Sequence, residues 1–218
     1  MNLEKMFKMQ AELDNRIIRE KGLEGQDLLP NTYVALITEL GEFANEGRWF
    51  KHWSNKQEPN PNRTGYIDCD VCVDQPGRYE VIHEGEILSL PCPKCEDREE
   101  VYVGDRLLEE YVDCLHFFLS IAIKKGWKEE LNIPEEAIED FKEAGFDGGL
   151  SGAFLEMQWH LLNSRMFKKE DIKKMNFQSA WGLFLAIGII GFGFTLDQIE
   201  EAYMNKNAVN HKRQQEGY

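Results

Sequence analysis

The stretch Tyr33-Val-Ala-Leu-Ile-Thr-Glu-Leu-Gly-Glu-Phe-Ala-Asn-Glu46 joins an apolar run to three acidic residues. On a helix with about 100° per residue, Glu39, Glu42 and Glu46 fall within about 60° of arc and share one face. Gly41 stands between the first two acids. Glycine lowers helix stability there, which indicates a packing or functional reason for it. The stretch predicts a helix with an apolar side and an acidic side.

A second stretch, Leu108-Glu-Glu-Tyr-Val-Asp-Cys-Leu-His-Phe-Phe-Leu119, has the same character. Glu110 and Asp113 share one face of the expected helix. The opposite face is apolar and carries Leu108, Tyr111, Leu115, Phe118 and Ala122. Two antiparallel helices would bring the acidic faces together, where like charges repel unless a cation neutralises them. Oxygen ligands of this kind suit Mg²⁺, although composition and spacing alone leave a solvated acidic face as the alternative.

The composition is that of a soluble globular protein with an acidic balance. Of 218 residues, 25 are Lys or Arg and 39 are Asp or Glu, so the formal net charge is −14. Binding to a nucleic-acid polymer or an anionic membrane needs clustered basic residues, so we expect neither partner. The start of the chain, Met1-Asn2-Leu3-Glu4-Lys5, has no secretory signal, and we expect a cytoplasmic protein.

Helical periodicity runs through most of the chain. Apolar residues recur at three- and four-residue steps over 3–21, 31–50, 105–126 and 195–216. Shorter helices are expected over 134–144, 150–166 and 177–190. These segments are joined mostly by short loops, so the sequence predicts an all-α helical bundle of one domain with a small appendage.

One segment is apolar enough to need a membrane test. Residues 176–196 contain no charged side chain, but glycines interrupt the run. Gly191 and Gly193 predict a helix end, and Thr195-Leu-Asp-Gln198 predicts the cap of the next helix. This leaves a helix of roughly 14 residues where a bilayer needs about 20. We therefore expect a buried core or subunit-interface helix, in which Gly182 and Gly188 allow close approach of a neighbour.

Residues 54–104 differ in composition and look inserted between two helices. Turn residues open the segment, and short β-like runs follow at 79–83 and 86–90. We expect a catalytic domain formed by 1–53 together with 105–218, and an inserted subdomain formed by 54–104.

Four of the five cysteines stand in two pairs, Cys69-Asp-Val-Cys72 and Cys92-Pro-Lys-Cys95. Two C-x-x-C knuckles at this separation match a tetrahedral zinc site of four thiolates. Since every position is a cysteine, the Zn²⁺ would be structural rather than catalytic. Two disulfides or free thiols are the alternative, which a reducing compartment disfavours. Cys114, alone in an apolar helix, is expected to be a small core residue.

The acidic helices resemble those of a known family. The pairs Glu39-x-x-Glu42 and Glu110-x-x-Asp113 are similar to those of the all-α nucleoside triphosphate pyrophosphohydrolases, which include MazG-like enzymes and dimeric dUTPases. Phe50-Lys-His-Trp-Ser54 and Tyr203-Met-Asn-Lys-Asn-Ala-Val-Asn-His-Lys-Arg-Gln214 resemble more specifically the dimeric dUTPases of phages and firmicute bacteria. The cysteine-bearing insert departs from the usual pattern of that family.

The resemblance implies Mg²⁺-dependent hydrolysis of dUTP to dUMP and pyrophosphate, with dUDP as a further substrate, by a homodimer. It implies metal ligands at Glu39, Glu42, Glu110 and Asp113. Glu39 and Glu42 are the candidate catalytic residues, and Glu39 would orient or deprotonate the attacking water.

The last expected helix carries a polar stripe at steps of three, four and three residues, formed by Tyr203, Lys206, Asn210 and Arg213. In the context of the family we expect this stripe to bind the nucleotide. Lys206 and Arg213 would meet phosphate oxygens, for which arginine offers a bidentate fork. Asn210 would bond the sugar or a phosphate.

The resemblance also implies base contacts from the first helix and from the aromatic segment near residue 50. Gln10 and Asp14 lie one turn apart and would reach the polar edge of uracil. Trp53 offers a stacking surface, Lys51 a further cation, and Glu46 a further substrate contact.

Two other hypotheses stay open. A MazG-like enzyme of other or broader dNTP specificity would keep the fold and the Mg²⁺ site but prefer different nucleotides. A zinc-knuckle interaction protein would use the helices only as a scaffold for the insert. A panel of nucleotide substrates separates the first hypothesis from a dUTPase. Deletion of residues 56–103, followed by assays of enzymatic activity and of partner capture, tests the second hypothesis.

Overall fold

A computed structural model describes residues 1–60, 66–68, 78–83, 86–91, 100–102 and 105–217. The chain divides into two compact units, Met1–Pro59 with Leu107–Tyr218 and, separately, Asn60–Arg106. The predicted zinc ligands, Cys69, Cys72, Cys92 and Cys95, lie outside the described residues. The structural Zn²⁺ therefore stays a prediction of the sequence, which a zinc assay on the purified protein tests.

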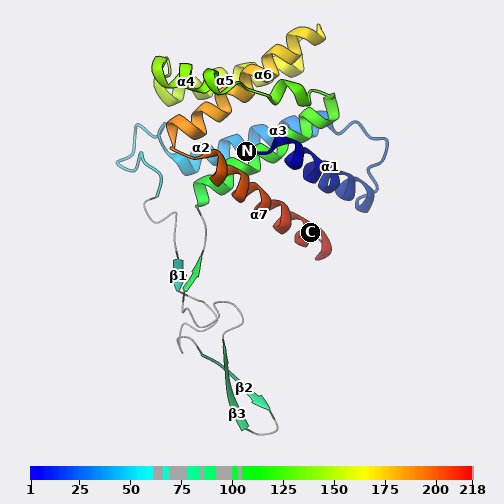
Figure 1. The fold of residues 1–218 in the computed structure, drawn as a ribbon, viewed down its shortest axis with the longest axis vertical. Coiled ribbons are helices and arrows are strands. Elements are labelled where there is room, and N and C mark those ends of the chain that lie inside the picture. Colours follow the sequence, from blue (N-terminus) through cyan, green and yellow to red (C-terminus); the bar gives the residue numbers. More distant parts are fainter. Residues whose placement is uncertain (61–65, 69–77, 84–85, 92–99, 103–104, 218) are drawn as a thin grey trace. The chain divides into compact units, whose positions relative to one another are not determined.

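The smaller unit contains short antiparallel strands (Figure 1). Strand β1 (Tyr66–Asp68) pairs with β4 (Glu100–Tyr102), and β2 (Arg78–His83) pairs with β3 (Glu86–Pro91). Strands β2 and β3 occupy the segments where the sequence shows β-like runs.

The larger unit is built from helices, which confirms the predicted all-α fold. Its α-helices are α1 (Leu3–Glu20), α2 (Leu29–Gly47), α3 (Arg106–Lys125), α4 (Glu135–Ala144), α5 (Gly149–Met166), α6 (Glu170–Ala186) and α7 (Leu196–Gln215). A 3₁₀-helix, η1 (Lys128–Leu131), follows α3, and a π-helical segment, η2 (Ile187–Gly191), continues α6. Thr195 begins α7 with a capping box, as the sequence predicts, since Thr195 and Gln198 each bond the backbone of the other.

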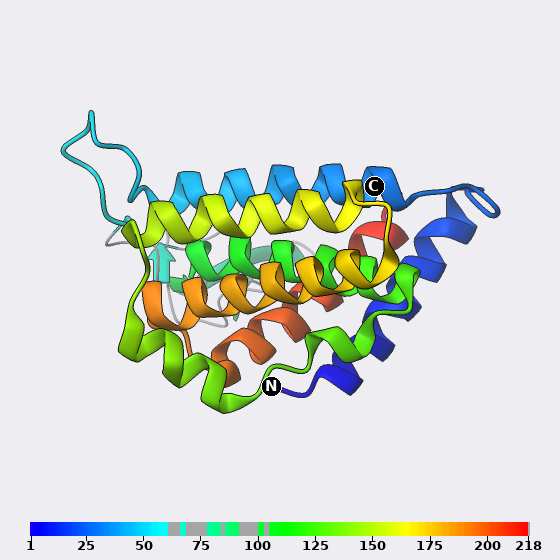
Figure 2. The same ribbon diagram turned by 90° about the horizontal axis from the view of Figure 1, so that it is seen from above.

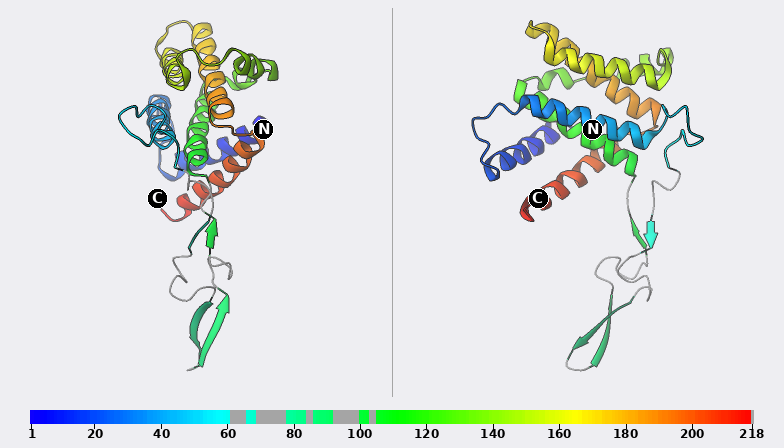
Figure 3. Two further views of the ribbon diagram at one scale, coloured as in Figure 1. Left: turned by 90° about the vertical axis from the view of Figure 1, so that its left-hand side faces the viewer. Right: turned by 180° about the vertical axis from the view of Figure 1, so that it is seen from behind.

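The longer helices form three pairs, with α2 and α3 between α5 and α6 on one side and α1 and α7 on the other (Figures 1 and 3). Helix α3 is therefore covered from both sides. Val112, Cys114 and Leu119 lie away from its predicted apolar face and are nevertheless fully buried. The apolar surface of α3 is therefore wider than the single apolar face that the sequence predicts. The prediction that Cys114 is a core residue is confirmed. Glu110 and Asp113 remain half-buried on this helix.

Two helix boundaries differ from the sequence prediction. Helix α6 begins at Glu170 rather than at 177, because the acidic first turn, which favours a helix N-terminus, precedes the uncharged run. Helix α2 ends at Gly47 rather than at 50, because Arg48 adopts a left-handed φ of 63°. The ring of Trp49 then folds back to 2.6 Å from the position of a Cβ on Gly47.

The two glycines expected to allow close helix approach behave differently. A Cβ on Gly188 would lie 2.5 Å from the ring of Tyr111, which is fully buried and stacks on Phe184 with centroids 4.1 Å apart. A Cβ on Gly182 would meet its nearest neighbour, Ile133, at 3.9 Å, an ordinary contact. The close approach is therefore real at Gly188 and absent at Gly182.

No single helix among the described residues is long and apolar enough to cross a membrane. The segments Glu170–Gly191 and Leu196–Gln215 together have the length and composition of a membrane span, but they are bent by 110° at their junction. Most of the apolar part of α6 is buried inside the larger unit, including Phe177, Trp181 and Phe184.

Gly188→Ala is expected to destabilise the protein by about 1–3 kcal/mol, because the added methyl group overlaps a buried ring that has no room to move. Gly182→Ala is the matched control on α6 and is expected to be neutral or stabilising by up to about 1 kcal/mol through helix propensity. Urea unfolding midpoints of the variants measure both effects. Equal midpoints for the two would contradict this account of the α3–α6 contact.

Candidate active site

Three acidic side chains from α2 and α3 converge. One carboxylate oxygen each from Glu39, Glu42 and Glu110 lies within 4.8 Å of the others, and we call these residues the acidic cluster. Oxygens that ligate one Mg²⁺ lie about 2.1 Å from it and therefore up to about 4.2 Å apart. Small side-chain rotations would close the acidic cluster around such an ion. The donor set thus fits Mg²⁺ in both chemistry and spacing.

Repulsion within this site alters the protonation of Glu39. Its pKa is raised from the ordinary 4.5 to about 7, first by burial and then by the charges of Asp113, Glu42 and Glu110. The carboxyl group of Glu39 is thus half-buried beside three other acids, and it gains the most from a neutralising cation.

Asp113, the fourth predicted metal ligand, has a different partner. Its Oδ2 lies 2.6 Å from Nζ of Lys206 on α7, and each side chain is 18% exposed. Burial raises the pKa of Asp113 in spite of the Lys206 ammonium and the more distant charge of Arg213. The structure therefore places Lys206 of the predicted α7 stripe in contact with a predicted metal ligand, and the charge of Arg213 also acts on that ligand.

The amide of Gln10 uses all its hydrogen-bonding positions inside the larger unit. Its Oε1 accepts from Nδ1 of His116 at 2.7 Å and from the hydroxyl of Tyr203 at 3.1 Å. Its Nε2 donates to Oδ1 of Asp14 at 2.8 Å and to the hydroxyl of Ser120 at 3.3 Å. Ser120 in turn donates to Asp14. We call these five residues the buried polar network.

The buried polar network contains three predicted substrate residues, Gln10, Asp14 and Tyr203. Their hydrogen bonds connect α1, α3 and α7 to one another. Gln10 is 3% exposed and Tyr203 is fully buried, so neither presents a free polar group to solvent. Asp14 lies at the edge of the network, where Nζ of Lys124 is 3.0 Å from its Oδ2. Of the predicted base contacts on α1, only Asp14 faces outward.

The remaining predicted substrate residues are dispersed. Nζ of Lys51 binds the carbonyl of Asn45 at 3.1 Å and its side-chain oxygen at 2.6 Å, which caps the end of α2. Trp53 is 68% exposed and packs edge-on against Phe50. Glu46 and Asn210 are both half-buried. Glu46 lies outside the three-carboxylate cluster, although it shares its helix face.

Polar residues that the sequence reasoning missed continue the acidic face of α3. They form a polar stripe at steps of three, four and four residues: Asp113, His116, Ser120 and Lys124. This spacing within an otherwise apolar helix is a sequence signal that predicts one polar face. Burial lowers the pKa of His116 to about 3, so its ring is neutral. Because Nδ1 bonds Gln10, the proton sits there, and Nε2 is a buried acceptor without a partner among the described residues.

A hollow of about 280 Å³ adjoins the buried polar network. Ala35 on its wall lies one helical turn before Glu39, and Phe117 lies one turn after Asp113, so the hollow and the acidic cluster are neighbours along α2 and α3. Its lining combines polar and apolar side chains: Asp14, Asn31, Thr32, Ser120, Lys124, Ile17, Ile18, Leu23, Leu28, Ala35 and Phe117.

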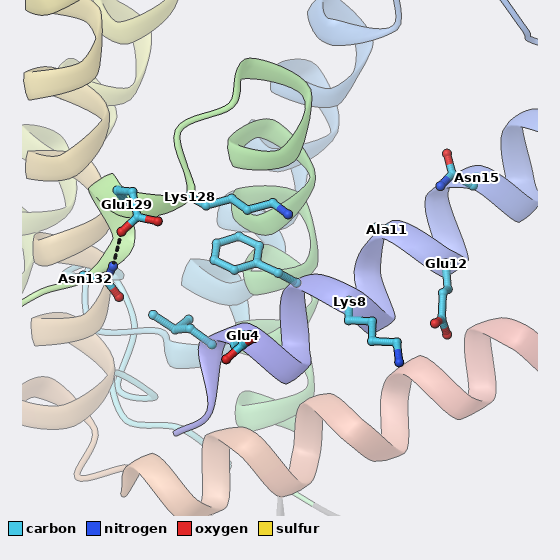
Figure 4. A pocket seen from close by; sticks show the side chains of 10 residues that line it. Glu4, Lys8, Ala11, Glu12, Asn15, Lys128, Glu129 and Asn132 are labelled. Atoms are coloured by element: carbon cyan, nitrogen blue, oxygen red, sulfur yellow. Dashed lines mark hydrogen bonds between the residues drawn. The ribbon is translucent and has the colours of Figure 1, made fainter.

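A larger hollow of about 690 Å³ lies between the start of α1 and η1 (Figure 4). Lys8 and Lys128 stand at its edges together with Glu4, Glu12 and Glu129, so side chains of both charges line it. Its lining includes none of the predicted site residues, which separates it from the acidic cluster.

The helical body and its facing acids and cations are typical of a nucleoside triphosphate pyrophosphohydrolase. A family model described as dUTPase matches residues 2–69 and 101–218, which include both acidic helices and α7. Within that class, the chain belongs to the dUTPase family and is a dUTP diphosphatase with a nucleotide substrate. Residues 70–100, with three of the paired cysteines, fall outside the match. A comparison with curated proteins gave no match.

The raised pKa of Glu39 makes the stability of the metal-free protein depend on pH. Between pH 4.5 and about 7 the folded protein retains a proton that the unfolded chain has released, so the free energy of unfolding falls as the pH rises. The raised pKa of Asp113 acts in the same direction. We expect the melting temperature of chelator-treated protein to fall across this window, and to fall less in Glu39→Gln.

Glu24→Gln, at an exposed loop position, is the control for loss of one negative charge. It is expected to keep the pH slope of the unmodified protein. Saturating Mg²⁺ is expected to flatten the slope of the unmodified protein toward that of Glu39→Gln. Identical slopes for all three proteins without metal would show that folding does not raise the pKa of Glu39.

Proposed function

We propose that the protein hydrolyses dUTP to dUMP and pyrophosphate with Mg²⁺ held by the acidic cluster, and that it also hydrolyses dUDP to dUMP and phosphate. The observation that carries this proposal is the convergence of Glu39, Glu42 and Glu110 opposite Lys206 in a chain of the dUTPase family. An acidic protein can bind a polyphosphate in this way because a divalent cation stands between the two negative partners.

Bound Mg²⁺ would polarise the phosphoryl oxygens and lower the pKa of water. We assign to Glu39 the uptake of the proton from the attacking water. Its half-buried position and raised pKa make it a better proton acceptor than the exposed Glu42, since a base works best with a pKa near the working pH. Glu42 and Glu110 would then serve mainly to hold the ion.

The phosphates would lie between the acidic cluster and α7. Lys206 already reaches Asp113 at 2.6 Å, and the charge of Arg213 also acts on Asp113. Both cations thus stand within electrostatic reach of the space beside the cluster. A lysine offers a compact charge and an arginine a planar fork for phosphate oxygens.

The hollow of about 280 Å³ is our candidate for the base. It adjoins the acidic cluster, so a nucleotide with its phosphates at the cluster can place its base there. The half-buried ring of Phe117 offers a stacking surface, and Asp14 and Ser120 offer polar groups for the edge of uracil.

A substrate panel tests the function. With Mg²⁺, we expect turnover of dUTP to exceed that of dTTP, dCTP and dATP, with release of pyrophosphate. Glu42→Gln is expected to lower kcat by at least about 100-fold through loss of a metal ligand. Glu109→Gln, which removes an exposed acid from α3, should keep most of the activity. Preference for another base would favour the broader MazG-like specificity instead.

The same panel locates the base. Phe117→Leu is expected to raise KM for dUTP by about tenfold, the loss of one stacking contact. Trp53→Leu, at the exposed position, should change KM little. The opposite result would move the base from the hollow to the segment after α2.

We further propose that the protein is a homodimer that uses the outer surface of α2 and α5, which run side by side (Figure 2). Helix α5 is apolar on both sides: Ala153, Met157 and Leu161 face the core, while its outer side remains exposed. The exposed apolar residues of this surface, which we call the apolar face, are Val34, Leu155, Trp159, Leu162, Met166 and Phe167.

Large apolar side chains that gather on one exposed side of neighbouring helices are typical of interfaces. On α5 the exposed residues recur at steps of four, three and four, the spacing of a helix-packing seam. Gly41 on α2 also lies at this surface, with open space around the position of its Cβ. A second copy packing there would supply the packing reason for Gly41 that the monomer lacks.

Trp159→Glu is expected to convert the dimer to a monomer in multi-angle light scattering while circular dichroism stays helical. Val209→Glu, which charges an exposed apolar position on α7, should leave the dimer intact. A monomeric unmodified protein at micromolar concentration would contradict the proposal.

A further inference from the structure

Asp113 stands apart from the other predicted metal ligands. The carboxylates that approach one another within 4.8 Å are those of Glu39, Glu42 and Glu110, without Asp113. Asp113 is instead engaged by Lys206, at 2.6 Å between Oδ2 and Nζ. In this arrangement the ammonium group of Lys206 holds Oδ2 of Asp113, one of the two oxygens that Asp113 could offer to a metal ion.

An ion and an ammonium compete for the same carboxylate oxygen. The Lys206–Asp113 pair joins two helices, α7 and α3, and both side chains are only 18% exposed, so water screens the pair less than a surface ion pair. A polyphosphate carries several negative charges and is a stronger partner for Lys206 than one carboxylate. A phosphate group that arrives beside α7 would therefore draw Lys206 away from Asp113.

We propose that Lys206 determines when Asp113 becomes a metal ligand. In the nucleotide-free protein Lys206 holds Asp113, and an ion binds to the acidic cluster alone; a nucleotide phosphate takes over Lys206 and releases Asp113 to the metal. Lys206 is thus a positioning residue that couples nucleotide binding to completion of the metal site. The inference rests on the proposed Mg²⁺ site.

This coupling has to be reciprocal. If the nucleotide strengthens metal binding through Asp113, the metal strengthens nucleotide binding by the same factor. Phosphates that ligate the ion directly also couple the two, so that effect alone does not identify Lys206. The distinguishing property is that the contribution of Asp113 to metal binding depends on Lys206 before any nucleotide is present.

A double-mutant cycle on nucleotide-free protein tests this property. Binding of Mn²⁺, a spectroscopic substitute for Mg²⁺, is measured by electron paramagnetic resonance for the unmodified protein, Asp113→Asn, Lys206→Met and the double variant. Asp113→Asn alone is expected to weaken binding by no more than about twofold, and Lys206→Met to tighten it about three- to tenfold. In the Lys206→Met background, Asp113→Asn should weaken binding about fivefold or more.

Lys212→Met is the matched control for loss of one positive charge from α7. Lys212 is 74% exposed, pairs with Glu216 and has no proposed part in the site. It should change Mn²⁺ affinity by less than about twofold. Equal effects of Asp113→Asn in both backgrounds, or equal effects of the two lysine variants, would overturn the inference. Circular dichroism of each variant verifies the fold, and Lys206→Gln replaces Lys206→Met if the latter does not fold.

Failure of the proposed function gives a different result. If Glu42→Gln binds Mn²⁺ as tightly as the unmodified protein, the acidic cluster is not the metal site and the proposed function itself fails. If Glu42→Gln loses Mn²⁺ but the cycle shows no dependence on Lys206, only the present inference fails.

Discussion

Carboxylate oxygens of Glu39, Glu42 and Glu110 lie within 4.8 Å of one another at a contact between two helices, where their repulsion opposes packing. Burial of Glu39, and after it this repulsion, raises the pKa of its carboxyl group. The larger unit tolerates it because α2 and α3 are held by apolar contacts on both sides, between α5 with α6 and α1 with α7 (Figure 3). Stability from these layers thus maintains an arrangement of charge that a bound cation would relieve.

Helix α3 connects the parts of the site. Its first half carries Glu110 and Asp113, and its second half carries His116 and Ser120, which the amide of Gln10 ties to α1 and α7. Because Tyr203 on α7 belongs to the same network, the position of Lys206 one turn later is set by buried hydrogen bonds. The buried polar network therefore fixes where the Lys206 side chain starts on α7, from which it can reach Asp113.

Periodicity and spacing predicted the all-α fold, most helix ranges and the capping box at Thr195, because these depend on local patterns. The convergence of Glu39, Glu42 and Glu110 also followed from one helix face meeting another. Partner choice did not follow: the pairing of Asp113 with Lys206, and the use of Gln10 as an internal brace, depend on how three helices cross. The early end of α2 depends on the ring of Trp49 packing over Gly47, which the spacing of apolar residues does not predict.

Anomalous diffraction from crystals grown with Mn²⁺ tests the central claim most directly. Without nucleotide, we expect a peak about 2.2 Å from carboxylate oxygens of Glu39, Glu42 and Glu110. With a non-hydrolysable dUTP analogue, Asp113 should join the metal shell and Lys206 should contact a phosphate. A fully active protein whose Mn²⁺ peak lies elsewhere, with the acidic cluster bound only to water, would contradict the account.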